Sequence, residues 1–146
     1  MNGNLTEIVC IIDCSGSMDS LRSDAIGGFN SFIREQKKHP GDAKFTLILF
    51  DTEIQVVYDG TNLKDVTPLD ESLYIPNGST ALLDAIGITV ENLENRFKET
   101  PEENCPAKIV VAILTDGAEN ASKKWKRAEI FELIKNKTKQ NSWEFL

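Results

Sequence analysis

Residues 8–17 read IVCIIDCSGS, an apolar run followed at once by an aspartate and two serines. A short run rich in β-branched residues is typical of a buried strand in a parallel sheet. Asp13, Ser15 and Ser17 then fall at the carboxyl end of that strand, where open α/β sheets bind their ligands. One carboxylate and two hydroxyls are hard oxygen ligands of the kind that Mg²⁺ and Ca²⁺ prefer. The pattern therefore predicts a divalent-cation site at this turn.

Two later positions extend the pattern. Thr80 stands at the start of a helical pattern, and Asp116 follows a second apolar run at 109–114. Because a crossover connection places parallel strands side by side, we expect Asp13 and Asp116 to face one crevice. Two carboxylates held so close repel each other unless a cation or a proton lies between them. The later positions thus strengthen the prediction of a cation site.

This three-part set resembles the metal-ion-dependent adhesion site of the von Willebrand factor type A (vWA) family. The resemblance extends from about residue 8 to residue 146. It implies that three hydroxyls contact a metal ion and that two aspartates hold it directly or through water: Ser15, Ser17, Thr80, Asp13 and Asp116. The implied ion is Mg²⁺, with Mn²⁺ or Ca²⁺ as alternatives. Its open coordination position takes an Asp or Glu from a partner protein.

The alternation of strand and helix patterns predicts a three-layer, Rossmann-like α/β fold with right-handed crossovers. We expect strands at 8–13, 44–50, 54–58 and 108–115, and helices at 21–36, 81–98 and 126–139. The short turn at 51–53 allows only an antiparallel return, which predicts one antiparallel edge strand in a mainly parallel sheet. We also expect Gly27 and Gly28 to let the first helix pack closely on the sheet.

Length and composition narrow the class of protein. The 146 residues suit one domain, 1–146, and a net charge of −7 argues against nucleic-acid binding. No apolar run approaches the ~20 residues of a membrane span, and the start of the chain lacks the features of a signal peptide. The three cysteines cannot all pair, and free thiols fit a reducing compartment. We therefore expect a cytoplasmic protein without membrane contact.

The end of the chain leads to a further expectation. Residues 143–146 begin one more strand, whereas the vWA family continues after its fifth strand with a helix, a sixth strand and a closing helix. We expect this domain to lack its far sheet edge and a covering helix. An unpaired strand edge and an uncovered apolar face favour self-association through that incomplete edge.

Each site residue also has a purely structural interpretation. Asp13 could accept bonds from loop amides, Ser17 or Asp19 could cap the first helix, and Thr80 could cap the helix after it. The seven basic residues within 123–139 are interpreted as a solvated helix face, with a contact for an acidic partner as the alternative.

The enzyme alternative is a Mg²⁺-dependent phosphohydrolase of the haloacid dehalogenase type, which also carries an aspartate after its first strand. Its motif needs a second aspartate two residues later, and Ser15 occupies that position. The single histidine, in a turn-like segment, makes a Ser-His-Asp triad improbable. We therefore predict a metal-dependent protein-interaction module that is not an enzyme.

Overall fold

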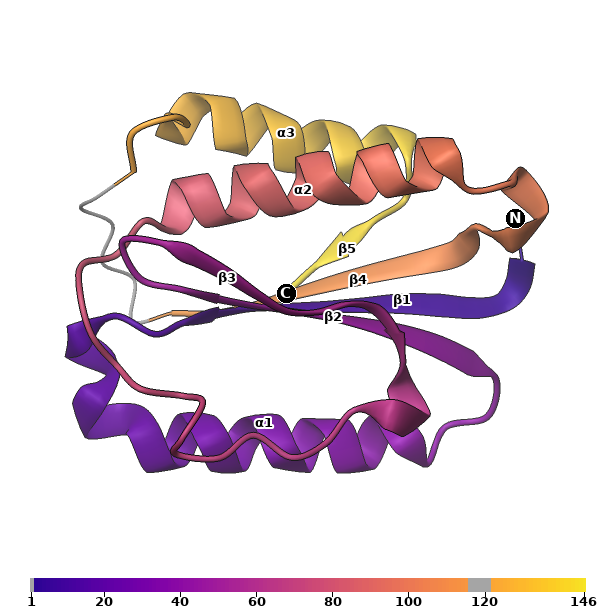
Figure 1. Cartoon of the computed structure of the whole chain (residues 1–146). Helices are drawn as coiled ribbons and strands as arrows, with labels where there is room; N and C mark the ends of the chain where they lie inside the picture. Colours follow the sequence, from indigo (N-terminus) through magenta and orange to yellow (C-terminus); the bar gives the residue numbers. More distant parts are fainter. Residues whose placement is uncertain (1, 116–121) are drawn as a thin grey trace.

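The structure, a computed structural model, describes residues 2–115 and 122–146. These residues form three layers, with a central sheet between α1 on one face and α2 and α3 on the other (Figure 1). The helices are α1 (Arg22–Lys37), α2 (Leu82–Glu99) and α3 (Arg127–Gln140). The strands are β1 (Asn2–Asp13), β2 (Asp42–Phe50), β3 (Ile54–Asn62), β4 (Pro106–Leu114) and β5 (Glu144–Phe145). The predicted three-layer α/β fold is confirmed.

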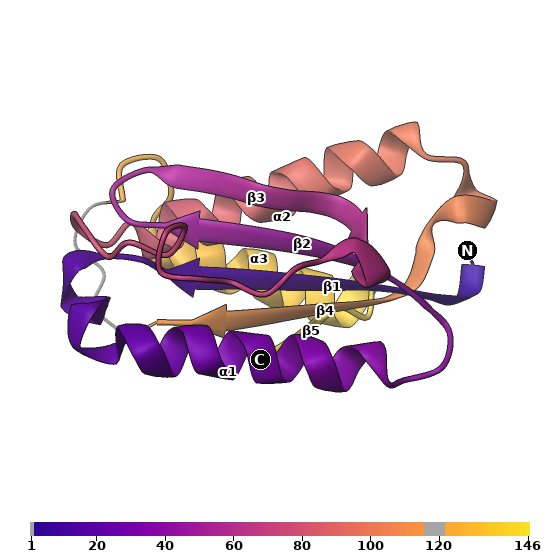
Figure 2. The ribbon, with the colours of Figure 1, turned by 60° about the horizontal axis from the view of Figure 1, so that its bottom comes forward.

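The sheet has the strand order β3-β2-β1-β4-β5, which Figure 2 shows side by side. β1 lies at its centre and pairs in parallel with both β2 and β4, and β4 pairs in parallel with β5. β3 pairs antiparallel with β2 at one edge, so the predicted antiparallel edge strand is confirmed. The parallel pairing of β1 with β4 also confirms that the first and fourth strands end side by side.

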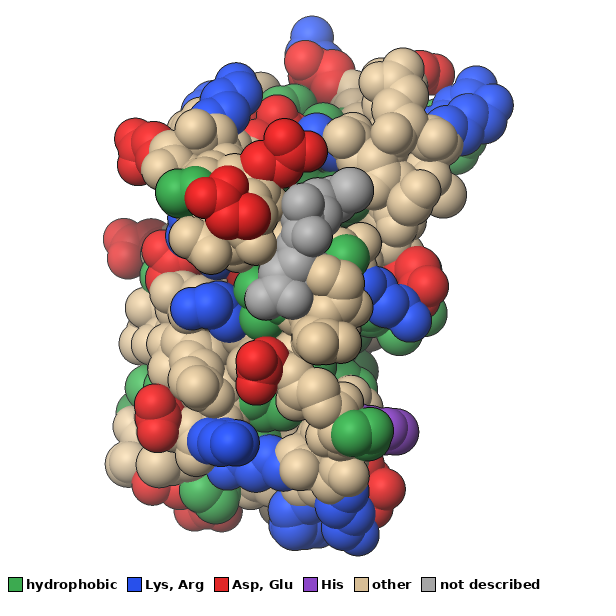
Figure 3. All heavy atoms as spheres, turned by 90° about the vertical axis from the view of Figure 1, so that its right-hand side faces the viewer, with side chains coloured by type: hydrophobic (Ala, Val, Ile, Leu, Met, Phe, Trp, Pro, Cys, Tyr) green, Lys and Arg blue, Asp and Glu red, His purple; other side chains and the backbone are tan. Residues whose placement is uncertain are grey.

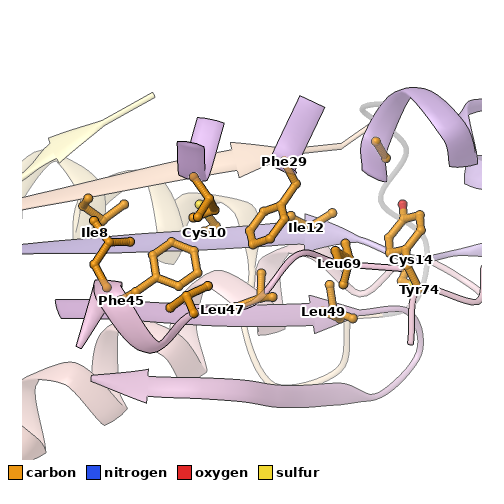
Figure 4. Close-up of a cluster of buried hydrophobic side chains, with 14 of the residues drawn as sticks. Ile8, Cys10, Ile12, Cys14, Phe29, Phe45, Leu47, Leu49, Leu69 and Tyr74 are labelled. Carbon is orange, nitrogen blue, oxygen red and sulfur yellow. The ribbon is translucent and has the colours of Figure 1, made fainter. Parts of the chain in front are cut away.

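Helices on both faces of the sheet explain why β1 is apolar without interruption. Ile8, Cys10 and Ile12 face α1, where they pack in one core cluster with Phe29 and other apolar side chains (Figure 4). Val9 and Ile11 point to the opposite face and join a second cluster with residues of α2 and α3. A strand covered on both faces buries every side chain, so its sequence does not alternate.

β1 and β3 are the strands that extend furthest beyond their predicted ranges. β1 begins at Asn2, because its first residues pair with β2 from Leu5 onward and with β4. β3 continues to Asn62 through Gly60, whose φ of +64° interrupts regular strand geometry. The Gly60 N–H donates to Thr46 Oγ1 at 3.0 Å, a side-chain contact from β2 that helps to hold this irregular strand in place.

The expectation for Gly27 and Gly28 is wrong. A Cβ added at either position would meet no heavy atom within 4 Å. Gly28 instead borders an apolar pocket of about 340 Å³ between α1 and β4, with Ala112 and Leu114 on its β4 side. α1 therefore packs on the sheet through larger side chains, such as Phe29, and not through its glycines.

The amino end of the parallel strands lies at the right of Figure 1 and faces the viewer in Figure 3. Lys and Arg side chains share this end with Asp and Glu side chains. On α3 most basic residues are exposed, as a solvated helix face requires, while Lys137 lies 3.1 Å from Glu94 of α2. Asp13, Ser15 and Ser17, which are predicted to bind a cation, lie at the opposite, carboxyl end.

Candidate metal centre

The Asp13 side chain is fully buried at the end of β1, yet it is held by two elements. Its Oδ1 accepts the Ser15 N–H at 2.8 Å, within the turn that follows the strand. Its Oδ2 accepts the Thr115 hydroxyl at 2.9 Å, directly after the end of β4. The structural interpretation of Asp13 predicted a hydrogen bond from a loop N–H, and that bond is present. The second bond orients the carboxylate between the two strand ends.

The two serine hydroxyls lie next to each other. Ser15 Oγ and Ser17 Oγ are 3.1 Å apart, with Ser15 buried and Ser17 exposed. Ser15 precedes a short 3₁₀ helix (Gly16–Leu21), but its side chain makes no capping hydrogen bond. α1 begins after Leu21, so neither Ser17 nor Asp19 occupies its N-cap position. Capping of the first helix therefore does not explain the positions of the Ser15 and Ser17 hydroxyls.

Thr80 reaches the same end of the sheet through a loop bonded to the turn after β1. The Gly16 N–H donates to the Gly78 carbonyl at 2.9 Å, and the Asn77 N–H donates to the Cys14 carbonyl at 3.0 Å. Gly78 has a φ of +76°, in the left-handed region that favours glycine. Thr80 is buried, and the N-cap position of α2 is Ala81. Thr80 therefore follows a loop that is hydrogen-bonded to the serine turn, and it does not occupy the N-cap position of α2.

The fifth predicted residue, Asp116, lies outside the described residues. The chain before it is fixed by the bond from Thr115 to Asp13. The chain after 121 is fixed by Asp84, in the first turn of α2. Its carboxylate accepts three backbone N–H groups at 2.8–3.0 Å, those of Lys123, Lys124 and Trp125.

Sequence reasoning missed this role of Asp84, and only its place in a helix's first turn hinted at bonds to backbone N–H groups. Gly87, one turn further along α2, is also required. A Cβ there would lie 2.3 Å from the Trp125 ring. The described chain on either side of 116–121 is therefore attached to the elements that carry Asp13 and Thr80.

The neighbouring thiol is not a competing ligand. Cys14 lies beside the buried Tyr74, whose hydroxyl donates to the Asp13 carbonyl at 2.5 Å (Figure 4). Burial raises the pKa of the Cys14 thiol to about 11, and the charge of Asp51 adds to the increase. The thiol donates to the Ile75 carbonyl at 3.3 Å, and sulfur is a soft ligand that hard cations such as Mg²⁺ and Ca²⁺ do not prefer.

The donor set fits a hard divalent cation. A buried carboxylate and three hydroxyls offer oxygen atoms alone, which suits Mg²⁺, Mn²⁺ or Ca²⁺. None of the ion pairs among the described residues includes Asp13. Within residues 2–115 and 122–146, no group of three or more His, Cys, Asp or Glu side chains is placed to hold a metal ion. A site here would therefore depend on its hydroxyls.

Comparison with known proteins identifies the fold. No family model matches the sequence, and no curated protein matches it. The structure is similar to the vWF domain of the type V pili tip protein Mfa5 from Porphyromonas gingivalis, with a TM-score of 0.61 and 18% identity. That match covers 82% of this chain and 40% of the other.

Two further solved structures are similar. One is the ArnB paralog VWA2 from Sulfolobus acidocaldarius, with a TM-score of 0.55, 22% identity, and 84% of this chain and 30% of that chain covered. The other is a von Willebrand factor type A protein from Catenulispora acidiphila, with a TM-score of 0.59, 20% identity, and 99% and 32% covered. The chain spans less than half the length of each of these solved chains. The fold expected from the sequence resemblance, that of a vWA domain, is confirmed.

Proposed function

We propose that this chain is a metal-dependent protein-interaction module. In this proposal Asp13, Ser15, Ser17 and Thr80, together with Asp116, hold one divalent cation at the carboxyl end of the sheet. The observation that carries the proposal is the buried Asp13 carboxylate at the end of β1, which accepts hydrogen bonds from the Ser15 N–H and the Thr115 hydroxyl. The Ser15 and Ser17 hydroxyls lie 3.1 Å apart in the turn that follows, and the loop before Thr80 is hydrogen-bonded to the same turn. The Asp13 carboxylate has no cationic partner among the described residues.

Electrostatics supports the choice of ligand. A buried carboxylate is costly unless a cation or hydrogen bonds compensate it, and among the described residues Asp13 has hydrogen bonds only. Mg²⁺ would supply the missing positive charge and a coordination position for an Asp or Glu of a partner protein. Uncharged hydroxyls complete the set without adding the repulsion that further carboxylates would bring.

The fold supports an interaction role over an enzymatic one. One similar solved structure is a domain of a pilus tip protein, and the others are named as vWA proteins. The phosphohydrolase alternative is not favoured, because Ser15 occupies the position where that chemistry needs a second aspartate.

We also propose a cytoplasmic location for this protein. Cys10, Cys14 and Cys105 all lie in the described part of the chain, and each is a free thiol. Free thiols support the cytoplasmic location predicted from the sequence. No helix in the described ranges has the length and apolar character needed to cross a membrane.

Calorimetric titration with MgCl₂ or MnCl₂ tests the metal site directly. We expect one site in the wild-type protein and loss of the binding heat in Asp13→Ala and Thr80→Ala. Asp24→Ala, which removes an exposed carboxylate on α1, should bind like the wild type. Absence of binding heat for both metals at millimolar concentration would contradict the proposal. Turnover of a generic phosphomonoester that is lost in Asp13→Asn would favour the enzyme instead.

We also propose self-association through the β5 side of the sheet. β5 pairs with β4 through only two residues, and Leu114 and Leu146 are exposed beside the apolar pocket under β4. Exposed apolar surface next to an unpaired strand edge favours association. Light scattering should detect an oligomer that Leu146→Lys weakens, whereas a monomer at high concentration would contradict this proposal.

A further inference from the structure

A second pocket opens directly beside the candidate metal centre. It has a volume of about 460 Å³, and Cys14, which separates Asp13 from Ser15, contributes to its lining. The turn between β2 and β3 lines it with Asp51 and Glu53, and the segment before the Thr80 loop lines it with Leu73 and Ile75. A ligand held at the metal centre would therefore lie next to this pocket.

The apolar wall of the pocket is exposed and yet fixed in place. Leu73 is 36% exposed and Ile75 is 58% exposed, so both side chains present apolar surface to solvent. The Ile75 carbonyl accepts the Cys14 thiol at 3.3 Å. Arg22 donates through Nε to the Tyr74 carbonyl at 3.0 Å and through Nη2 to the Glu71 carbonyl. These bonds tie the wall to the turn after β1 and to α1.

The other feature of the pocket is negative charge. Asp51 Oδ1 accepts the Glu53 N–H at 2.7 Å, and the Asp51 carbonyl accepts the Ala81 N–H at 2.9 Å. Asp51 is thereby held against the loop that carries Thr80. Neither Asp51 nor Glu53 takes part in an ion pair of the described residues. The pocket thus combines an apolar wall with two carboxylates that have no cationic partner there.

We propose that this pocket receives a Lys or Arg side chain of the partner, presented next to the Asp or Glu that the metal centre binds. A long basic side chain places its aliphatic stem on an apolar wall while its charged end stays near carboxylates. A purely apolar side chain would bring no charge to balance Asp51 and Glu53, and an acidic one would be repelled. The partner is therefore a protein segment with one acidic and one basic residue close together. This inference rests on the proposed function.

Selection from a library of random peptides tests the inference without a known partner. The library is bound to the 146-residue chain in MgCl₂, and bound peptides are eluted with EDTA and sequenced. We expect enrichment of Asp or Glu together with Lys or Arg a few positions away. Selection on Glu53→Lys should keep the acidic residue and lose the basic one. Selection on Glu71→Lys, an exposed carboxylate outside the pocket lining, should match the wild type.

A charge exchange measures the contact itself. Changing the basic residue of a selected peptide to Glu should weaken binding to the wild-type chain by roughly five-fold, the upper range for one solvent-accessible ion pair. The same peptide should regain affinity for Glu53→Lys. Peptides that are eluted by EDTA and carry an acidic residue without a basic one would overturn this inference and leave the metal-binding role intact. If EDTA elutes no peptide, the proposed function fails and this inference fails with it.

Discussion

β1 carries two fully buried carboxylates, Glu7 in the middle of the strand and Asp13 at its carboxyl end. Arg96 of α2 meets Glu7 with two hydrogen bonds, Nη1 to Oε1 at 3.0 Å and Nη2 to Oε2 at 3.2 Å. Thr46 adds a hydroxyl bond to Oε2 at 2.8 Å. Asp13 has hydrogen bonds from one amide and one hydroxyl, and no cation among the described residues.

The difference shows that burial alone does not mark a functional carboxylate. Glu7 is compensated within the fold: burial opposes the charge of Arg96, but the hydrogen bonds and charge of Glu7, with Asp59, raise the Arg96 pKa above its ordinary value. Glu7 and Arg96 thus form an ion pair that is compensated within the fold. Among the described residues, Asp13 accepts hydrogen bonds from neutral donors only, and the proposed cation would supply the compensating charge.

The largest expected effect comes from breaking the ion pair between Glu7 and Arg96. Arg96→Ala leaves Glu7 buried without its partner and should lower the free energy of unfolding by about 3–5 kcal/mol, as measured by urea denaturation. Replacing both Glu7 and Arg96 with leucine should recover most of this loss, since no buried charge remains. Glu35→Ala, which removes the exposed pair with Lys38, should change the stability by less than about 1 kcal/mol. If Arg96→Ala lowered the free energy of unfolding as little as Glu35→Ala does, the conclusion that Glu7 depends on Arg96 for its compensation would be wrong.

The second-largest expected effect is stabilisation by Mg²⁺, which should depend on Asp13 and not on Glu7. Mg²⁺ at about 100 times its dissociation constant should stabilise the wild-type chain by about 2.7 kcal/mol, because only the folded protein assembles the site. Thermal unfolding should show this shift in the wild type and in the double leucine variant at Glu7 and Arg96. Asp13→Asn should show none. A Mg²⁺ shift that survives Asp13→Asn would mean that the ion binds elsewhere.

The smallest of these effects concerns the glycine that gives Arg96 its space. A Cβ on Gly60 would lie 2.6 Å from Arg96 Nη1, and the φ of +64° disfavours any residue with a Cβ. Gly60→Ala should therefore cost about 1–2 kcal/mol in urea denaturation. Gly27→Ala is the matched control, with no atom near the added Cβ, and should instead gain about 0.5–1 kcal/mol as an alanine in a helix. Equal effects of the two changes would argue against close packing around Arg96.

The same contrast explains what the sequence could predict. Asp13, Ser15 and Ser17 are close in sequence and follow an apolar run, so both the strand and its polar end are local signals. Glu7 lies among polar residues at the start of the chain, and its partner Arg96 is 89 residues away. No local pattern links the two, so β1 was predicted to begin only at residue 8.

The end of β3 and the anchoring of residues 123–125 could not be predicted from the sequence for a related reason. β3 was predicted to end at residue 58, and residues 59–62, which follow, contain no apolar alternation. The side chain of Thr46 holds Gly60 from another strand. Asp84 likewise anchors the chain at 123–125 from 39 to 41 positions earlier. Contacts of this range depend on the completed topology and leave no signature in a short window of sequence.

The central place of β1 has a consequence for how the protein folds. The chain makes its middle strand first, yet the bond between Asp13 and Thr115 closes a loop of 102 residues. Parallel pairings of such long range are slow to form, because loop closure costs entropy before the contacts repay it. During synthesis, β1 therefore has an open edge until β4 emerges. The carboxyl end of β1 meets Thr115 only when β4 is in place, so a chain arrested before β4 would not assemble the proposed metal centre.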